Sequence, residues 1–198
     1  AGSTHHPILP RPFSVLYAEG STLHLLVKAV GEGTRLITEM AEGDANQLMG
    51  PLGNEFPAAP GAVLVAGGYG MAPLYFYARR HPDPKALHLF YGARTAEHLL
   101  LQDRWRALLP EANLHFVTED GSDGERGLVT LPLERFMKER PGTRPVLACG
   151  PTPMMKAVYA LAGAAIAIAI AVGHCATAAA QARELQRRLE AATRVECK

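Results

Sequence analysis

A glycine-rich turn after an apolar, strand-like run constrains the fold more than any other feature of the chain. The run over residues 63–66 ends in three glycines within four residues, followed by a proline: Gly67, Gly68, Gly70 and Pro73. Glycine permits positive φ and close backbone approach, and proline suits the first turn of a helix. A strand, tight turn and helix of this kind directs unpaired N–H groups and a helix dipole towards an anion, usually a pyrophosphate. The Rossmann spacing G-x-G-x-x-G is absent, so a nucleotide site and a plain strand–helix connection both remain open.

The composition narrows the possible functions. A chain of 198 residues forms one large domain or two small ones. Its formal net charge of +1 provides no electrostatic basis for binding nucleic acid or an acidic membrane. We see no positively charged leader before an apolar core, so we predict no signal peptide. The three cysteines do not make a disulfide framework, which favours the reducing cytoplasm.

Two halves of the chain have different patterns. In the first half, strand-like segments at 13–17, 23–30 and, more weakly, 47–49 predict an antiparallel sheet or part of a barrel. After a boundary near Pro57–Gly61, strands and helices alternate, which predicts a parallel sheet with helices on its faces. The predicted order is strand 62–66, helix 73–80, strand 86–91, helix 96–109, strand 113–118, helix 132–139, strand 145–149 and helix 153–161.

The segment 157–182 is rich in alanine and isoleucine. A membrane helix needs about 20 continuous apolar residues. Gly163, Gly173 and His174 interrupt this run, so we predict no membrane helix. We expect a buried helix followed by a strand. A second interpretation is that some residue identities in this segment are not those of the natural protein.

Two further motifs resemble anion sites. Arg11 can clamp a diphosphate by a bidentate contact, and Ser14 offers a hydroxyl to the edge of a flavin ring. The alternative for Arg11 is a surface arginine beside an ordinary strand. In Gly31-Glu32-Gly33-Thr34, backbone N–H groups and the Thr34 hydroxyl could hold a second phosphate, unless the glycines form only a turn.

The tripeptide Cys149-Gly150-Pro151 follows the last predicted parallel strand. Ligands of open α/β sheets bind outside the carboxyl ends of the strands, so we expect this tripeptide and Gly67–Pro73 to line one crevice. A cysteine there is more often a small buried residue than a nucleophile. No catalytic Ser/His/Asp or Cys/His grouping accompanies it, and the histidines lack metal-ligand spacing, so we predict neither a hydrolase nor a histidine metal site.

Several motifs occur in the order found in the ferredoxin–NADP reductase superfamily, which the chain resembles over residues 11–158. They are Arg11-Pro12-Phe13-Ser14, Gly31-x-Gly33-Thr34, Gly50-Pro51-Leu52-Gly53, Gly67-Gly68-x-Gly70-x-Ala72-Pro73, Phe90-Tyr91-Gly92-Ala93-Arg94 and Cys149-Gly150-Pro151-x-x-Met154. Within the superfamily the chain is most similar to the electron-transfer subunit of dihydroorotate dehydrogenase type B. That closer match is carried by Arg11–Val15, Gly50–Phe56 and Asp120-Gly121-Ser122-x-Gly124-x-x-Gly127.

The resemblance implies a truncated FAD-binding antiparallel β-barrel in residues 1–58, an NAD-binding α/β domain in residues 59–161 and an iron–sulfur-type segment in residues 162–198. Part of the barrel that precedes the first motif in the family is not represented. The implied FAD contacts are Arg11, Pro12, Phe13, Ser14, Gly31, Gly33 and Thr34. The implied nicotinamide nucleotide contacts are Gly67, Gly68, Gly70, Ala72, Pro73, Cys149, Gly150 and Pro151.

The family subunit also carries a [2Fe–2S] cluster held by four cysteines near its C-terminus. By that resemblance, Cys175 and Cys197 would be the second and fourth ligands. The first and third positions fall at Ile170 and Ala178, which cannot ligate iron. Either the chain has lost the cluster, or the residue identities here are not the natural ones.

The resemblance predicts a cytoplasmic electron-transfer flavoprotein of pyrimidine biosynthesis. It would pass electrons through FAD and the cluster, between NAD(H) and an FMN-bearing catalytic dihydroorotate dehydrogenase subunit. The resemblance implies that the two subunits form a heterotetramer. Glu119 and Asp120 favour NAD over NADP. Two alternatives stay open: a stand-alone NAD(P)H-dependent flavin reductase, and a non-enzymatic nucleotide-binding module.

Overall fold

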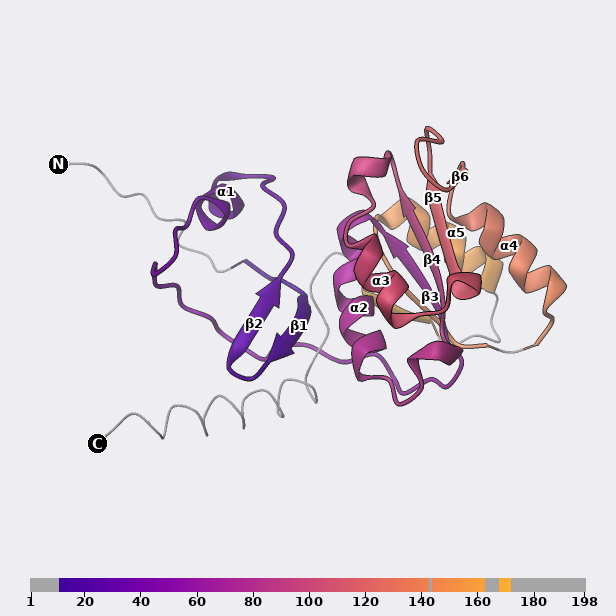
Figure 1. Cartoon of the computed structure of the whole chain (residues 1–198), viewed down its shortest axis with the longest axis horizontal. Helices are drawn as coiled ribbons and strands as arrows, with labels where there is room; N and C mark the ends of the chain where they lie inside the picture. Colours follow the sequence, from indigo (N-terminus) through magenta and orange to yellow (C-terminus); the bar gives the residue numbers. More distant parts are fainter. Residues whose placement is uncertain (1–10, 143, 163–167, 172–198) are drawn as a thin grey trace.

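The computed structural model describes residues 11–142, 144–162 and 168–171, which form a small N-terminal unit and a larger α/β unit (Figure 1). The larger unit contains a six-stranded sheet in the order β6-β5-β4-β3-β7-β8, and every adjacent pair is parallel. Its strands are β3 (Val63–Gly67), β4 (His88–Ala93), β5 (Leu114–Thr118), β6 (Glu125–Arg126), β7 (Val146–Cys149) and β8 (Ile168–Ala171). This confirms the parallel sheet predicted from the alternating pattern.

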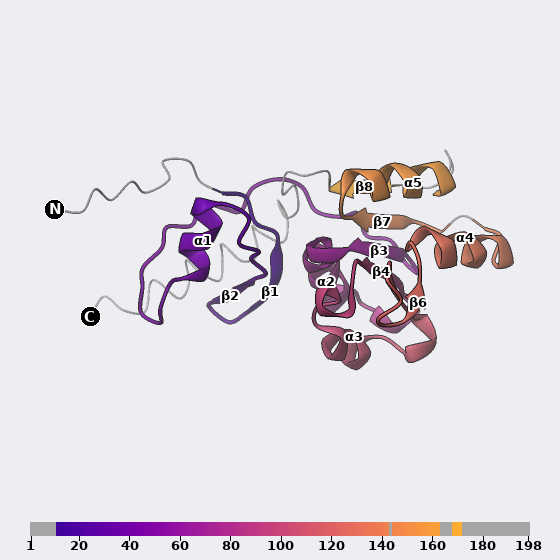
Figure 2. The same cartoon turned by 90° about the horizontal axis from the view of Figure 1, so that it is seen from above.

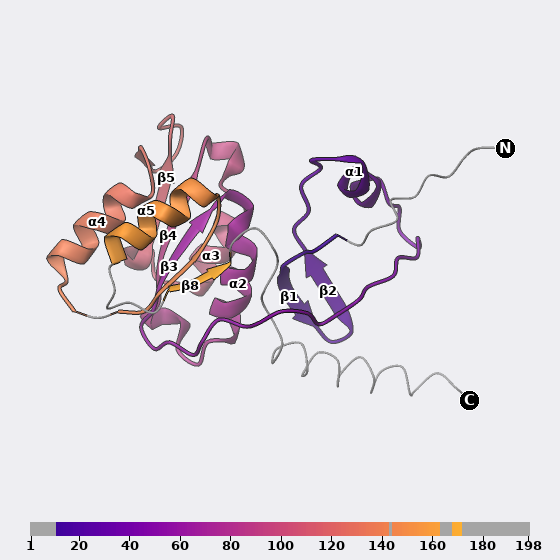
Figure 3. The same cartoon turned by 180° about the vertical axis from the view of Figure 1, so that it is seen from behind.

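Helices cover both faces of the sheet. The helices α2 (Met71–Arg80) and α3 (Gln102–Leu108) lie on one face, and α4 (Thr130–Glu139) and α5 (Thr152–Ala162) lie on the other (Figures 2 and 3). Short 3₁₀ turns occupy 68–70, 84–86, 96–98 and 111–113. Strand β3 is buried along its whole length, because Leu64 and Ala66 face the α2 side while Val63 and Val65 face the α4 side.

The strand order reverses between β3 and β7. From β3 the chain adds β4, β5 and β6 on one side, then crosses the opposite face and adds β7 and β8 on the other side. Adjacent loops therefore leave the carboxyl ends of β3 and β7 in opposite directions. In an open α/β sheet this point is where a ligand crevice forms.

The N-terminal unit consists of a hairpin and a short helix. Strands β1 (Val15–Glu19) and β2 (Thr22–Leu25) pair antiparallel, and α1 (Glu32–Thr38) follows. Tyr17 joins this unit to α2, because its ring meets that of Tyr75 edge-on at 6.4 Å and lies 4.8 Å from the Arg79 guanidinium. Arg79 also pairs with Glu19 at 2.8 Å.

The barrel prediction was wrong in detail for the described residues. The predicted strand 23–30 ends at Leu25, and the predicted strand 47–49 is not a strand. Leu48 and Met49 are 68% and 70% exposed, so no neighbouring strand in the described chain covers them. A strand needs a hydrogen-bonding neighbour, and among the described residues the antiparallel sheet consists of β1 and β2.

The single helix predicted over 96–109 was also wrong. A 3₁₀ turn at Ala96–His98 is followed by Leu101 at φ +59°, and α3 begins only at Gln102. The buried Tyr91 hydroxyl accepts a hydrogen bond from Leu100 N–H at 3.0 Å and donates to His98 C=O at 3.2 Å. Backbone groups that a continuous helix would pair are therefore bound to a side chain of the sheet.

The remaining helix predictions were confirmed within a few residues. The apolar segment after residue 157 continues α5 and then supplies strand β8, which confirms the predicted helix followed by a strand. The helix is not fully buried: Val158 and Ala162 face the core, but Tyr159 is 59% exposed. The short strand β6 was not predicted. Cys175 and Cys197 lie outside the described residues. Within the described part of the chain, no helix has the length and apolarity needed to cross a bilayer.

Candidate functional site

A cleft of about 850 Å³ opens where β3 and β7 end, and we call it the glycine cleft. One wall comes from the N-terminal unit and the other from the α/β unit. The lining segments are Pro12–Ser14, Leu26, Lys28, Gly67–Gly70, Ala72, Gly92–Arg94, His98, Glu119, Gly127–Thr130, Cys149–Pro151, Pro153–Met154 and Ala157. The cleft therefore lies at the point of strand-order reversal.

The floor of the glycine cleft is backbone, because it admits no side chain at three positions. A Cβ atom placed on Gly67 would lie 2.7 Å from Met154 Sδ and 2.7 Å from Pro151 Cδ. One on Gly150 would lie 3.0 Å from Gly67 Cα, and one on Gly70 would overlap the Cys149 carbonyl. Gly68 has φ +52° and faces open space. The glycines thus allow β3 and β7 to end close together and leave the turn accessible.

Three helices begin at the glycine cleft. The lining residues include the first turns of α2, α4 and α5, at Ala72, Thr130 and Met154 respectively. None of these first turns contains an acidic side chain. The unpaired N–H groups and positive dipole ends of helix N-termini favour an anion. This arrangement fits the diphosphate of a nucleotide, as the sequence predicted for the turn after β3.

Few charged side chains line the cleft. Lys28 lies on the wall of the N-terminal unit, and its Nζ is 5.6 Å from the centre of the Tyr69 ring on the opposite wall. Arg94 and Glu119 follow the carboxyl ends of β4 and β5, and Glu119 N–H donates to Ala93 C=O at 3.0 Å. Behind this wall, burial raises the pKa of Tyr91 to about 12 despite its hydrogen bond from Leu100.

The structure brings most of the predicted site residues together. Those that line the cleft are Pro12, Phe13, Ser14, Gly67, Gly68, Gly70, Ala72, Cys149, Gly150 and Pro151. Arg11 does not line it, and Pro73 is buried within the first turn of α2. Cys149 is half-buried rather than fully buried.

The second predicted phosphate motif lies apart from the cleft, at the start of α1. The Thr34 hydroxyl donates to Gly31 C=O at 3.0 Å and accepts from the N–H groups of Val30 and Gly31 at 2.9 and 3.1 Å. It therefore caps its own helix. The roles of Gly31, Gly33 and Thr34 in holding a phosphate stay predictions.

Sequence reasoning did not single out Lys28, Tyr69 or Thr130. Tyr69 lies inside the glycine turn, so its position next to the cleft could have been inferred from the motif. Thr130 enters the cleft because the short strand β6 turns the chain back towards it, and that strand has only two residues. A strand of two residues is too short to show an alternating hydrophobic pattern, so the sequence could not predict it.

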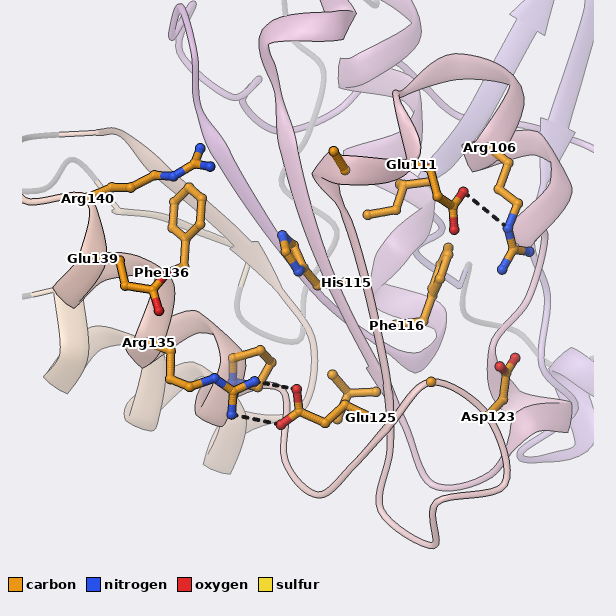
Figure 4. A pocket seen from close by; sticks show the side chains of 15 residues that line it. Arg106, Glu111, His115, Phe116, Asp123, Glu125, Arg135, Phe136, Glu139 and Arg140 are labelled. Atoms are coloured by element: carbon orange, nitrogen blue, oxygen red, sulfur yellow. Dashed lines mark hydrogen bonds and ion pairs between the residues drawn. The ribbon is translucent and has the colours of Figure 1, made fainter.

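A second cavity, of about 440 Å³, runs along strand β5 at the open side of the sheet, and we call it the edge groove (Figure 4). Four of its charged side chains form two pairs. Arg135 forms a bidentate pair with Glu125, and Arg106 Nε lies 3.6 Å from Glu111 Oε2. Arg140 lies 5.0 Å from the centre of the Phe136 ring.

Burial lowers the pKa of two histidines near the edge groove. Burial, then the positive charge of Arg140, lowers the pKa of His115, whose ring stacks on Phe90 at 4.2 Å. Burial and the same arginine lower the pKa of His88 to about 4. Among the described residues, no group of three or more potential ligands could hold a metal ion.

Comparison of the sequence with known protein families shows which class of protein this chain resembles. Residues 64–160 match the family model described as the oxidoreductase NAD-binding domain. This range contains the strands, glycines and helix starts that form the floor of the cleft. The match supports the resemblance to the ferredoxin–NADP reductase superfamily that the motifs predicted.

Similarity to individual proteins narrows the resemblance to one kind of subunit. The chain is 36% identical over 152 residues to the "Dihydroorotate dehydrogenase B (NAD(+)), electron transfer subunit" of Caldanaerobacter subterraneus subsp. tengcongensis, covering 76% of this chain and 58% of the relative. It is 35% identical over 150 residues to the probable protein of that name from Thermococcus kodakarensis, covering 75% and 60%. The predicted resemblance to this subunit is confirmed. The chain spans about three fifths of the length of these relatives.

Solved structures show the same fold. An NADH-dependent reduced ferredoxin–NADP oxidoreductase superposes with a TM-score of 0.67 at 28% identity, over 82% of this chain and 60% of that chain. Phthalate dioxygenase reductase superposes with a TM-score of 0.51 at 20% identity, over 80% and 52%, which is evidence of fold alone.

Proposed function

We propose that the chain is part of an electron-transfer subunit that passes electrons between NAD(H) and a dihydroorotate dehydrogenase catalytic subunit in pyrimidine biosynthesis. The observation that carries this proposal is the glycine cleft. Pro12–Ser14 line one wall of this cleft, and the Gly67–Gly70 and Cys149–Pro151 segments line the other. The relatives named as electron transfer subunits of dihydroorotate dehydrogenase B supply the particular reaction.

In this proposal the two walls hold two cofactors. Pro12, Phe13 and Ser14 would lie against the flavin of FAD, and Arg11 and the Gly31–Thr34 turn would hold its diphosphate. The turn after β3 and the first turns of α2 and α5 would hold the NAD diphosphate. Bound flavin supplies hydride acceptance and release of single electrons.

The residues of the cleft act by positioning. Gly67 and Gly150 carry no side chains of their own, so the floor at the ends of β3 and β7 stays shallow and leaves room for a planar ring. The opposing wall at Phe13 and Ser14 then limits the space available to that ring. Hydride transfer between two rings needs no side-chain acid or base, which agrees with the uncharged floor of the cleft.

The four-cysteine pattern does not fit this sequence. Ile170, at the first ligand position, pairs with Ala148 in strand β8 and carries no sulfur. With Ala178 at the third position, only Cys175 and Cys197 remain as thiolates. We therefore derive no step through a [2Fe–2S] cluster, although the cluster belongs to the function predicted by resemblance.

This mismatch favours one alternative, a stand-alone NAD(P)H-dependent flavin reductase of the same superfamily. Such an enzyme would reduce a soluble acceptor at full rate without a partner. The electron-transfer subunit would instead act through a catalytic dihydroorotate dehydrogenase subunit, in a cytoplasmic complex. In this proposal the FAD-binding part ends at residue 58 and the NAD-binding domain ends at residue 161.

The test is the visible spectrum and partner dependence of the protein expressed from its intact gene. We expect bound flavin that is bleached by NADH, and dihydroorotate-dependent NAD⁺ reduction only when the catalytic subunit is added. A colourless protein that binds NADH would support the nucleotide-binding module instead. Full activity with a soluble acceptor, unchanged by the catalytic subunit, would identify the stand-alone reductase.

A further inference from the structure

Met154 covers the gap between the two glycines at the ends of β3 and β7. A Cβ atom on Gly67 would lie 2.7 Å from Met154 Sδ, and one on Gly150 would lie 2.6 Å from Met154 Cε. The thioether therefore lies directly on both glycines. It is half-buried and lines the glycine cleft, so its outer surface faces any ligand that enters.

The direction of the Met154 side chain follows from its place in α5. It is the third residue of the helix, and helical side chains point back towards the N-terminus. The side chain consequently extends over the start of its own helix towards Gly150 and the end of β3. The next residue, Met155, faces the core instead and is 4% exposed. Of the two adjacent methionines, Met154 therefore lines the cleft and Met155 lies in the core.

We propose that Met154 is a positioning residue whose thioether supports the planar ring of the bound nicotinamide nucleotide. This inference rests on the proposed function and specifies how deep the ring lies in the cleft. A thioether is polarisable and makes favourable contacts with aromatic rings, and its unbranched chain adapts to the shape above it. Because Gly67 and Gly150 beneath it carry no Cβ, the thioether sets the height of the cleft floor.

The consequence for the reaction is geometric. Hydride transfer depends steeply on the separation of the two rings, and a displacement of about 1 Å costs on the order of 100-fold in rate. Met154→Ala removes the support without adding a clash. We expect the rate of flavin reduction at saturating NADH to fall at least about 10-fold by the same dependence. The affinity for ADP-ribose, which lacks the nicotinamide ring, should change less than about 2-fold, because the diphosphate contacts at the helix N-termini remain.

Two matched variants separate positioning from stability. Met154→Leu keeps a side chain of similar volume and should retain most of the reduction rate. Met155→Ala makes the same chemical change one residue further on, in the core, and should lower the melting temperature while leaving the reduction rate unchanged. A reduction rate that follows the melting temperature across the three variants would overturn the inference.

A direct readout does not depend on turnover. In full-length flavin-bound protein labelled with ¹³C at the methionine methyls, NAD⁺ should shift the Met154 methyl resonance, and ADP-ribose should not. The Met155 methyl should move with neither. If the wild-type flavin is reduced by NADH but the Met154 methyl does not respond, the inference fails and the proposed function stands. If the wild-type flavin is not reduced by NADH, the proposed function fails.

Discussion

The glycine cleft and the edge groove are both large cavities of the same sheet, yet they differ in what forms their walls. The cleft is lined by glycine turns and helix starts, with backbone at its floor. The groove is lined by long charged side chains, three of them arginines: Arg106, Arg135 and Arg140. Two of these arginines are already paired with glutamates.

The comparison indicates that unused hydrogen-bonding capacity, rather than charge, marks the ligand site. Backbone N–H groups at the starts of α2 and α4 remain available for an anion because no side chain caps these helices. Charged side chains at a surface satisfy one another, which leaves little for a ligand to gain. The two cavities can therefore be distinguished by substitutions that affect each separately.

The largest expected effect comes from Gly70→Ala. The new Cβ would overlap the Cys149 carbonyl, so the ends of β3 and β7 must move apart. Overpacking of this kind costs roughly 1–3 kcal/mol, and since it deforms the cleft we expect NADH affinity to fall about 100-fold. Isothermal calorimetry with NADH measures the loss.

Gly124→Ala is the matched control for that substitution. Its Cβ would overlap the Phe116 carbonyl at the edge groove, and Gly124 also has φ +66°. We expect a comparable loss in the free energy of unfolding with unchanged NADH affinity. Equal effects of the two alanines on NADH binding would contradict the distinction between the cavities.

Acid should destabilise the packing behind the edge groove, where the centre of the His88 ring lies 4.7 Å from that of the Phe136 ring. Burial, followed by Arg140 and Arg144, lowers the pKa of His88 from 6.5 to about 4. The unfolded chain therefore binds more protons between these values, so stability is complete above pH 6.5 and is lost as the pH falls towards 4. We expect the free energy of unfolding to decrease by about 2 kcal/mol from pH 7 to pH 5.

Urea unfolding at the two pH values measures this change. His88→Phe removes the titrating group and should flatten most of the dependence, whatever its effect at pH 7. His115, whose pKa is lowered in the same direction, accounts for a remaining slope. An unchanged pH dependence in the variant would assign the acid sensitivity to other groups.

A smaller effect is expected from Glu119→Gln in the cleft. A carboxylate at this wall repels the 2′-phosphate of NADP, so its neutral isostere should improve NADPH affinity relative to NADH by about 10-fold. The ratio of the two dissociation constants, measured on the same preparation, checks it. A ratio identical to that of the wild type would place cofactor selection elsewhere.

The smallest effect is expected from Arg135→Ala in the edge groove. The Arg135–Glu125 pair is bidentate, but both side chains are partly exposed, at 57% and 39%. Exposed pairs contribute about 0–1 kcal/mol, so the free energy of unfolding should fall by no more than about 1 kcal/mol. NADH affinity should not change. A large loss of affinity would show that the groove belongs to the nucleotide site.

Much of the α/β unit could be predicted from local signals. The apolar run before Gly67 and the prolines near the starts of α2 and α5 marked the elements correctly, because each signal lies within a few residues of its consequence. The break in the helix predicted from Ala96 could not be foreseen. It depends on the Tyr91 hydroxyl, which reaches residues 98 and 100 only once the sheet has formed.

The same distinction holds for the site. The glycines and the Cys149–Pro151 turn were recognised as parts of one crevice, since parallel strands place their carboxyl ends at one edge. No local sequence pattern connects Lys28, Tyr69 and Thr130 with this crevice, so the sequence did not predict their place in it. The predicted strand at 47–49 failed for the opposite reason: its local pattern had no neighbouring strand in the described chain.

The sequence alone determined which residues can form the nucleotide turn, because only glycine tolerates the close approach of β3 and β7 and the positive φ at Gly68. It also determined the alternation of strands and helices in the α/β unit, apart from β6 and the break before α3. Only the tertiary structure decided that three helix starts face one cleft and that Met154 covers its floor. Those arrangements depend on the reversal of strand order at β3, where segments distant in the chain meet.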